Sequence, residues 1–330
     1  MGGGRHVSAY VIPLYGRIPD SELPTVSYRV LVCLGNCRSM KPYYQDDHAT
    51  ITTNRIYTAN CAEFMSERMQ PETVDLTVTS PPYDDMRDYQ GYSFPFEDIA
   101  KGLYRITKDG GVVVWVVGDK IKGGRSLTSF RQALYFQELG FQCHDVMIYE
   151  KKNTPFMRKN AYTNAFEFMF ILTKGKPKTF NPLVTVTQQS GFRRNGALYN
   201  KGADGVNRKR DIVYNEKKTR TNIWRYSVGL HGTTSDKFAF KHPAMFPEKL
   251  AEDHILSWSN AGDLVFDPMN GSGTTCKMAQ KHQRKYIGVD ISPEYCEIAA
   301  RRLAQEVLPL CHRTIRMTTP LSTTATLGTY

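Results

Sequence analysis

The sequence lacks the features by which membrane-spanning, secreted and disulfide-stabilised proteins are recognised. No apolar run approaches the roughly 20 residues that a membrane span needs, and no basic stretch followed by an apolar core stands at the N-terminus. The seven cysteines include no Cys-x-x-Cys pair, and their number is odd. We therefore expect no membrane segment, no secretory signal, no disulfide framework and no zinc or other metal site. We also expect a reducing, cytoplasmic environment.

Acidic residues are fewer than basic ones. The 330-residue chain has 43 Lys and Arg against 32 Asp and Glu, which gives a formal net charge of +11. An excess of this size fits a polyanionic partner, although it also occurs in basic soluble proteins without one. Hydrophobic content of 41% and charged content of 23% are ordinary for a globular protein. The length suffices for one large α/β domain with an insert, or for two small domains.

From residue 56 onward the chain alternates between β-branched apolar runs and segments with helical periodicity. The predicted strands are 56–58, 74–79, 112–117, 145–149, 166–172, 263–266 and 285–289. The predicted helices are 61–69, 96–107, 126–139, 247–258, 274–283 and 293–308, and Asp109-Gly110-Gly111 is predicted to be a turn. Strands that alternate with helices indicate an α/β fold with a mostly parallel sheet.

The strand predicted at 74–79 ends at two consecutive prolines, in the run Ser80-Pro81-Pro82-Tyr83. Each proline lacks an N–H and forces the residue before it into an extended conformation. The loop is therefore stiff, with carbonyl oxygens held outward, at the edge where open α/β sheets bind ligands. Such acceptors suit an exocyclic amino group on a planar base, with Tyr83 stacked on the ring. The alternative is a polyproline-type loop that ends a strand and exposes a tyrosine.

A second candidate site follows the strand predicted at 263–266, in the run Asp267-Pro268-Met269-Asn270-Gly271-Ser272-Gly273-Thr274-Thr275. This Gly-x-Gly loop, the helix after it and a strand that ends in Asp290, 17 residues beyond Gly273, indicate a nucleotide-binding βαβ unit. Asp290 is placed to hold both ribose hydroxyls. A dinucleotide is an alternative ligand, but Cys276 replaces the third glycine, and Asp267 favours an amino-acid moiety over a pyrophosphate. A P-loop is excluded because no Gly-Lys-Ser/Thr follows.

Between residues 185 and 237 the apolar periodicity fades and basic residues gather. They are interleaved with aromatic residues and glycines; the cations are Arg193, Arg194, Lys201, Arg208, Lys209, Arg210, Lys217, Lys218, Arg220 and Arg225. One interpretation is a nucleic-acid surface, in which cations meet phosphates and Arg193, Arg194, Asn195 and Arg225 are candidates for reading bases. The other is a solvated loop with spare lysines.

Three stretches together resemble one family. Asp-Pro-Met-Asn-Gly-Ser-Gly-Thr-Thr at 267–275 resembles the S-adenosylmethionine loop of DNA amino-methyltransferases, and Thr-Ser-Pro-Pro-Tyr at 79–83 looks like their catalytic loop in the form usual for cytosine-N4 enzymes. Lys-His-Pro-Ala-Met-Phe-Pro at 241–247 is similar to the segment before the cofactor loop. Their order, over about residues 54–308, resembles the permuted arrangement of the beta group. The family often has Gly-Asp-Cys where this chain has Ala59-Asn60-Cys61.

The resemblance implies a Rossmann-like methyltransferase fold, with helices on both faces of a twisted, mostly parallel sheet. It also implies an inserted target-recognition region. The expected parts are an N-terminal extension of unassigned role at 1–48, a catalytic half at 49–182, the insert at 183–240, a cofactor-binding half at 241–313 and a disordered tail at 314–330.

Roles for individual residues also come from the resemblance. The implied catalytic residues are Ser80, Pro81, Pro82 and Tyr83. The implied cofactor-binding residues are Asn60, Thr79, Phe246, Asp267, Pro268, Asn270, Gly271, Ser272, Gly273, Thr274 and Asp290. The implied DNA-binding residues, within the basic insert, are Arg193, Arg194, Arg208, Lys209, Arg210 and Arg225.

The implied activity is site-specific methyl transfer from S-adenosyl-L-methionine to the N4 amino group of a cytosine flipped out of duplex DNA. Adenine-N6 methylation stays open, because the same loop geometry serves both amino groups. Carbon-5 methylation is set aside, because no cysteine follows a proline. A nicotinamide-dependent oxidoreductase and a non-catalytic DNA-binding protein are alternatives of other classes. The resemblance points to a bacterial, archaeal or phage-encoded protein, and it leaves open a homodimer and a cognate restriction endonuclease.

Overall fold

A computed structural model describes residues 51–82, 94–121, 123–154, 159–186, 198–210, 216–242 and 244–306. The predicted extension at 1–48 and the tail at 314–330 lie outside this described part. So do four candidate residues, namely Tyr83, Arg193, Arg194 and Asn195. Lys209 and Arg210 are described through their backbone alone.

An eight-stranded sheet forms the centre of the fold, in the order β1-β12-β11-β2-β3-β5-β4-β10. Its strands are β1 Arg55–Thr58, β2 Val74–Thr79, β3 Thr107–Val117, β4 Gln142–Lys151, β5 Phe166–Thr173, β10 Ile223–Tyr226, β11 Leu264–Asp267 and β12 Lys285–Asp290. All neighbours pair in parallel except β5, which is antiparallel to both β3 and β4. The predicted α/β class with a mostly parallel sheet is confirmed.

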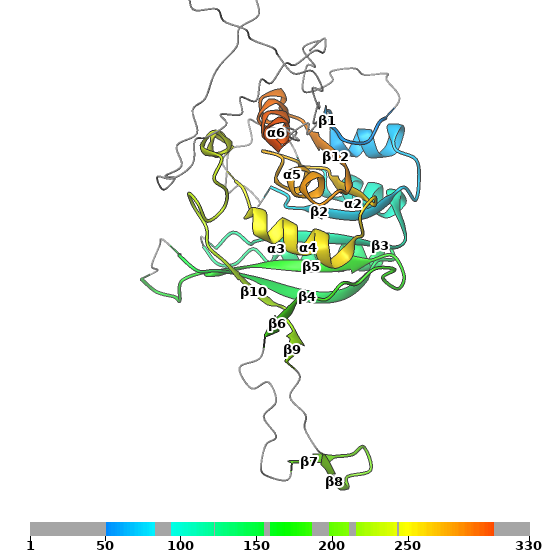
Figure 1. The fold of residues 1–330 in the computed structure, drawn as a ribbon, viewed down its shortest axis with the longest axis vertical. Coiled ribbons are helices and arrows are strands. Elements are labelled where there is room, and N and C mark those ends of the chain that lie inside the picture. Colours follow the sequence, from blue (N-terminus) through cyan, green and yellow to red (C-terminus); the bar gives the residue numbers. More distant parts are fainter. Residues whose placement is uncertain are drawn as a thin grey trace, which may run out of the picture. The chain divides into compact units, whose positions relative to one another are not determined.

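Helices cover both faces of this sheet. One face carries α4 Glu248–Trp258, α5 Thr274–Lys281 and α6 Pro293–Glu306, drawn in yellow to orange in Figure 1. The other carries α1 Cys61–Glu63, the π-helix η1 Phe64–Arg68, α2 Phe96–Ile106 and α3 Thr128–Glu138. A short 3₁₀ helix, η2 Lys237–Lys241, precedes α4. No helix in the described part of the chain is long and apolar enough to cross a membrane.

Strand β3 shows why the sheet is recognisable in the sequence. Val112, Val114 and Val116 belong to the core under α4, α5 and α6, whereas Val113, Trp115 and Val117 belong to the core under α2. A strand that is buried on both faces reads as a continuous apolar run, because neither face needs polar residues.

The predicted turn at Asp109-Gly110-Gly111 is wrong, because these residues lie inside β3. The local sequence resembles a turn because the strand is irregular there: Gly110 has φ +75° and the pairing with β2 shifts register between Val74 and Leu76. Gly110 keeps both backbone groups bonded, donating to the Lys174 carbonyl and accepting from the Lys178 amide. Tertiary pairing therefore outweighs the local turn signal.

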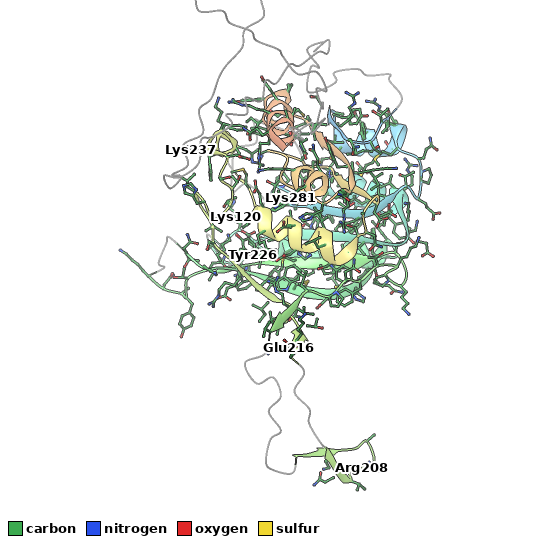
Figure 2. All side chains as sticks on the ribbon, viewed as in Figure 1. Lys120, Arg208, Glu216, Tyr226, Lys237 and Lys281 are labelled. Atoms are coloured by element: carbon green, nitrogen blue, oxygen red, sulfur yellow. The ribbon has the colours of Figure 1, made fainter. Side chains whose placement is uncertain are left out.

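The stretch that we assign to the insert contains two kinds of structure. Two small antiparallel sheets pair β6 Val184–Val186 with β9 Lys217–Thr219, and β7 Leu198–Lys201 with β8 Asn207–Arg210, the strand on which Figure 2 labels Arg208. Strand β10, in contrast, extends the central sheet by pairing in parallel with β4. Within the described residues, the part that is separate from the central sheet ends before Ile223.

Candidate active site

The strands β1, β2, β11 and β12 run in parallel, so their carboxyl ends meet at one edge of the sheet. A cavity of about 610 Å³ lies at this edge. Twelve residues that the sequence singles out lie on its wall: Asn60, Ser80, Pro81, Pro82, Phe246, Asp267, Pro268, Asn270, Gly271, Ser272, Thr274 and Asp290. The stretches around Ser80 and Gly271, far apart in the chain, therefore face one space.

Backbone hydrogen bonds, within the loop and to β12, hold the glycine loop that follows β11. The Asn270 amide donates to the Val289 carbonyl at 2.9 Å, and the Gly273 amide donates to the Asn270 carbonyl at 2.8 Å. Gly273 has φ +81°, and a Cβ there would lie 2.7 Å from the Cβ of Ala299 on α6. Only glycine fits both demands. Gly273 thus shapes the loop from behind and does not line the cavity.

Asp290 ends β12 and is bonded to the glycine loop. One carboxylate oxygen accepts from the Gly271 amide at 2.7 Å and the other from the Ser292 amide at 2.9 Å. Burial raises the pKa of this carboxyl, while the two amide donors act in the opposite direction. Each carboxylate oxygen can accept a second hydrogen bond, so both can still receive hydroxyl groups from a ligand in the cavity.

Asp267 ends β11 and is almost fully buried, with 2% exposure. Its Oδ1 accepts from Thr79 Oγ1 at 2.8 Å and from the Met269 amide at 3.2 Å. Burial raises the pKa of the Asp267 carboxyl to about 7, against the effect of these donors. Thr79 itself is not on the wall of the cavity. Its hydroxyl orients the Asp267 carboxylate and thereby links the Ser80 loop to the glycine loop.

Asn270 provides a test of whether the cavity fits a polar ligand. Its side chain is 4% exposed and lines the cavity, yet its amide nitrogen and oxygen have no hydrogen-bond partner among the described residues. Gly288 makes room for it, because a Cβ there would lie 2.6 Å from Asn270 Oδ1. Buried amides are normally bonded. The loop thus presents a donor and an acceptor where a nucleoside-containing cofactor would bind.

Asn60 has a structural role that the sequence did not indicate. It is the N-cap of α1, and its Oδ1 accepts from the Ala62 amide at 2.9 Å. This bond satisfies one of the free amides at the start of the helix. Asn60 also lines the cavity, so capping and ligand contact fall on one side chain.

Several cavity residues were missed in the sequence. Tyr149, Lys151 and Glu167 contribute polar atoms, with Lys151 Nζ 2.5 Å from Glu167 Oε1. His242 lies against the glycine loop, since a Cβ on Gly271 would be 2.7 Å from His242 Nε2, and its ring meets Tyr295 edge-on at 4.4 Å. Of these residues, only His242 could have been found in the sequence, because it stands in the Lys241–Pro247 segment that resembles the stretch before the cofactor loop. The others are ordinary strand or helix residues until the sheet assembles.

The described DNA-binding candidates do not line this cavity. Arg208 forms a two-pronged ion pair with Asp204, and Arg225 on β10 is paired with Glu150 on β4. Arg225 also lines a second hollow of about 360 Å³ together with Lys152, Arg220, His231 and Lys249. Of the candidates whose side chains the structure describes, Arg208 and Arg225 are thus not part of the wall where Asp267 and Asp290 gather.

Comparison with known proteins agrees with this architecture. The profile of the DNA methylase (N6/N4 methyltransferase) family matches residues 74–301. The orphan methyltransferase M.BamHII of Bacillus amyloliquefaciens is 57% identical over 251 residues, which are 74% of this chain and 94% of that protein. The DNA adenine methyltransferase YhdJ of Escherichia coli (strain K12) is 26% identical over 247 residues, 72% of this chain and 78% of its own.

Among solved structures, the cytosine-N4-specific PvuII DNA methyltransferase superposes with a TM-score of 0.56 at 22% identity. The match covers 77% of this chain and 87% of that one. At this identity the similarity supports the fold. The profile match spans both the Ser80 loop and the glycine loop, and the chain therefore belongs to the DNA methylase family, whose members act on DNA with S-adenosyl-L-methionine as cofactor.

Proposed function

We propose that this protein is a cytosine-N4 methyltransferase that acts site-specifically on duplex DNA. The observation that carries the proposal is the position of Ser80-Pro81-Pro82 on the wall of the cavity that the glycine loop also lines. Serine at position 80 resembles the cytosine-N4 form of the catalytic loop, where adenine enzymes have aspartate. The PvuII enzyme, which shares the fold, is itself described as cytosine-N4-specific.

The cofactor site is proposed to be the glycine-loop end of the cavity. Asp290 would hold the ribose hydroxyls, Asp267 the charged amino-acid moiety, and Asn270 a further polar group, because all three line that end of the cavity and two of them, Asp267 and Asn270, are buried. S-adenosyl-L-methionine, when bound, supplies an electrophilic methyl group on a sulfonium. No nucleophilic side chain is then required, and the work of the protein is alignment.

The Ser80 loop is proposed to activate the amino group. The lone pair of cytosine N4 is delocalised into the ring, so the nitrogen is a poor nucleophile. Acceptors on its two hydrogens favour a pyramidal nitrogen and localise the lone pair. The fixed dipoles of the Ser80 hydroxyl and the carbonyls of the Ser80-Pro81 segment would also stabilise the positive charge that develops there. Tyr83, which lies outside the described residues, is proposed to stack on the flipped base.

Adenine-N6 methylation is the second candidate, because the adenine methyltransferase YhdJ is also a relative. The test is to incubate the protein with duplex DNA and methyl-deuterated S-adenosyl-L-methionine, then to digest the DNA and identify labelled nucleosides by mass spectrometry. We expect labelled N4-methylcytosine. Labelled N6-methyladenine alone would contradict the proposal and leave the family assignment intact.

The insert is proposed to recognise the target sequence. Sequencing the modified positions in the same DNA would give the recognition site. We also propose that residues 49–182 and 241–313 form the two halves of the methyltransferase domain and residues 183–240 the insert, and that a homodimer and a partner restriction endonuclease belong to the same system.

A further inference from the structure

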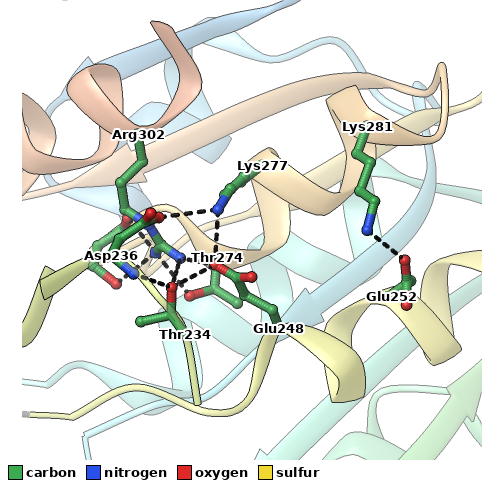
Figure 3. A network of polar contacts seen from close by, with 9 residues as sticks. Thr234, Asp236, Glu248, Glu252, Thr274, Lys277, Lys281 and Arg302 are labelled. Atoms are coloured by element: carbon green, nitrogen blue, oxygen red, sulfur yellow. Dashed lines mark hydrogen bonds and ion pairs between the residues drawn. The ribbon is translucent and has the colours of Figure 1, made fainter. Parts of the chain in front are cut away.

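Behind the glycine loop lies a cluster of four charged side chains, two buried and two partly buried, shown in Figure 3. Arg302 on α6 is fully buried, and Lys277 on α5 is 7% exposed in its side chain. Both pair with Asp236, which precedes η2, and with Glu248 at the start of α4. None of the four lines the cavity. Two cations and two anions therefore meet where four segments of the chain converge.

Arg302 is the member that contacts the glycine loop directly. Its NH1 donates to the Ser272 carbonyl at 2.8 Å, to Ser272 Oγ at 3.0 Å and to Thr274 Oγ1 at 3.1 Å. The peptide bond between Ser272 and Gly273 is planar, and its N–H donates to the Asn270 carbonyl at 2.8 Å. Both polar groups of this peptide are thus held, one by Arg302 and one by Asn270.

The remaining nitrogens of the Arg302 guanidinium contact the segment 229–242 and the start of α4. Its Nε donates to Asp236 Oδ2 at 3.0 Å, and its NH2 donates to Glu248 Oε1 at 2.5 Å and to Thr234 Oγ1 at 3.4 Å. Thr234 and Asp236 belong to the segment 229–242, which contributes Gly229, Thr233, Phe240 and His242 to the cavity. One planar group therefore links two walls of the same cavity.

The two carboxyls of the cluster are stabilised in their ionised forms. Burial opposes ionisation of Asp236 and Glu248, but the hydrogen bonds and ion pairs with Lys277 and Arg302 outweigh it and lower the pKa of both carboxyls. A lysine in place of Arg302 would retain the charge. Its ammonium has three donors on one nitrogen and lacks the rigid fork of a guanidinium, so it would not hold the Ser272 carbonyl, Asp236 and Glu248 in the same geometry.

We propose that Arg302 is a positioning residue for cofactor binding, which fixes the Ser272–Gly273 peptide against the cavity wall formed by residues 229–242. It acts through the loop and makes no contact with the ligand. Its loss therefore weakens cofactor binding more than it slows methyl transfer at saturating cofactor. This role holds for either amino group as the methyl acceptor.

The test compares Arg302→Lys with Arg284→Lys by calorimetry of S-adenosyl-L-methionine binding. Arg284 is a matched control, because it is partly buried, donates to the Ser259 and His282 carbonyls, and lies off the cavity wall. We expect Arg302→Lys to raise the Kd by about tenfold or more, as charge-assisted hydrogen bonds are removed. Its kcat at saturating cofactor should stay within roughly threefold of the wild type. Arg284→Lys should lower the thermal stability without changing the Kd.

A cofactor Kd within about twofold of the wild type in Arg302→Lys, or an equal rise in Arg284→Lys, would overturn the proposal. Thr234→Val serves if Arg302→Lys does not fold. It removes the hydroxyl that accepts from Arg302 and the Asp236 amide and donates to Glu248, at nearly constant volume. In Thr234→Val we expect a smaller rise in the cofactor Kd than in Arg302→Lys. An unchanged Kd would contradict the positioning role of Arg302.

Discussion

The glycine loop and the basic insert are built in opposite ways. In the loop, Asp267, Asn270, Ser272 and Thr274 are buried, and backbone bonds fix their positions. In the insert, the described residues of β6 and β9 are exposed, and each small sheet has only two strands. A site that aligns one cofactor needs rigid surroundings. A surface that meets a polyanion needs accessible cations. The comparison suggests that cofactor binding and DNA binding can be disrupted separately.

The largest effect is expected from adding one methyl group to the glycine loop. Gly273→Ala should abolish or weaken S-adenosyl-L-methionine binding by well over about tenfold, because the positive φ costs about 1–3 kcal/mol and the new Cβ would lie 2.7 Å from Ala299 Cβ. Gly262→Ala is the matched control, since Gly262 has φ +89° with nothing within 4 Å of an added Cβ. Calorimetry should show normal cofactor affinity in the control.

The next effect concerns the catalytic loop. Tyr83→Ala should slow turnover, because the lost base stacking raises the barrier by about 1–3 kcal/mol. The cofactor affinity should stay unchanged. Ser80→Ala should reduce it less, because the neighbouring carbonyls remain. Single-turnover rates with saturating cofactor would measure both. A wild-type rate in Tyr83→Ala would remove the stacking role.

Asp267 should give cofactor binding a dependence on pH. Its pKa is about 7 in the folded protein. If the carboxylate meets the positively charged amino-acid moiety, the affinity should fall by about tenfold per pH unit below that value, because a proton must leave on binding. Asp267→Asn should bind more weakly at pH 8 and show a flatter profile. Parallel profiles for the two proteins would place the ammonium elsewhere.

The same pKa predicts the opposite trend for the free protein. The folded pKa is raised above the unfolded one, so the folded state binds the extra proton between about pH 4 and pH 7. The stability from this group is complete below about pH 4 and is lost as the pH rises through about 7. Relative to Asp267→Asn, the free wild-type protein should therefore lose stability over this range, as denaturant titrations would show.

The sequence predicted the elements whose signals are local. The glycine loop, the strand before it and Asp290 are contiguous and could be read together. The element β10 was missed, although Trp224 and Tyr226 are buried and Ile223 and Arg225 are exposed, which is the two-residue alternation of a strand. Its four residues are too few to stand out, and its pairing partner β4 is distant in the chain. The Arg302 cluster could not be predicted, because its members come from four separate segments.

The smallest effect is expected in the insert. Replacing Arg208, Lys209 and Arg210 together by alanine should flatten the salt dependence of DNA affinity. The slope of log K against log salt concentration should decrease in magnitude by up to about 0.9 for each phosphate that is no longer neutralised. The ion pair of Arg208 with Asp204 should reduce the contribution of that arginine. The control removes three exposed cations off the cavity wall, Lys101, Lys176 and Lys285. Equal slopes in wild type and the insert variant would mean that the cluster is a solvated face.

The most direct test of the separation between cofactor binding and DNA binding is to measure the affinity for each ligand in a glycine-loop variant and in an insert variant. Cofactor and DNA binding would be titrated for Gly273→Ala and for the Arg208, Lys209 and Arg210 triple variant, at several salt concentrations. Two separable regions predict that Gly273→Ala loses the cofactor and keeps the DNA affinity and its salt slope. They predict that the triple variant keeps the cofactor and loses DNA affinity. A loss of both affinities in either variant would contradict the separation.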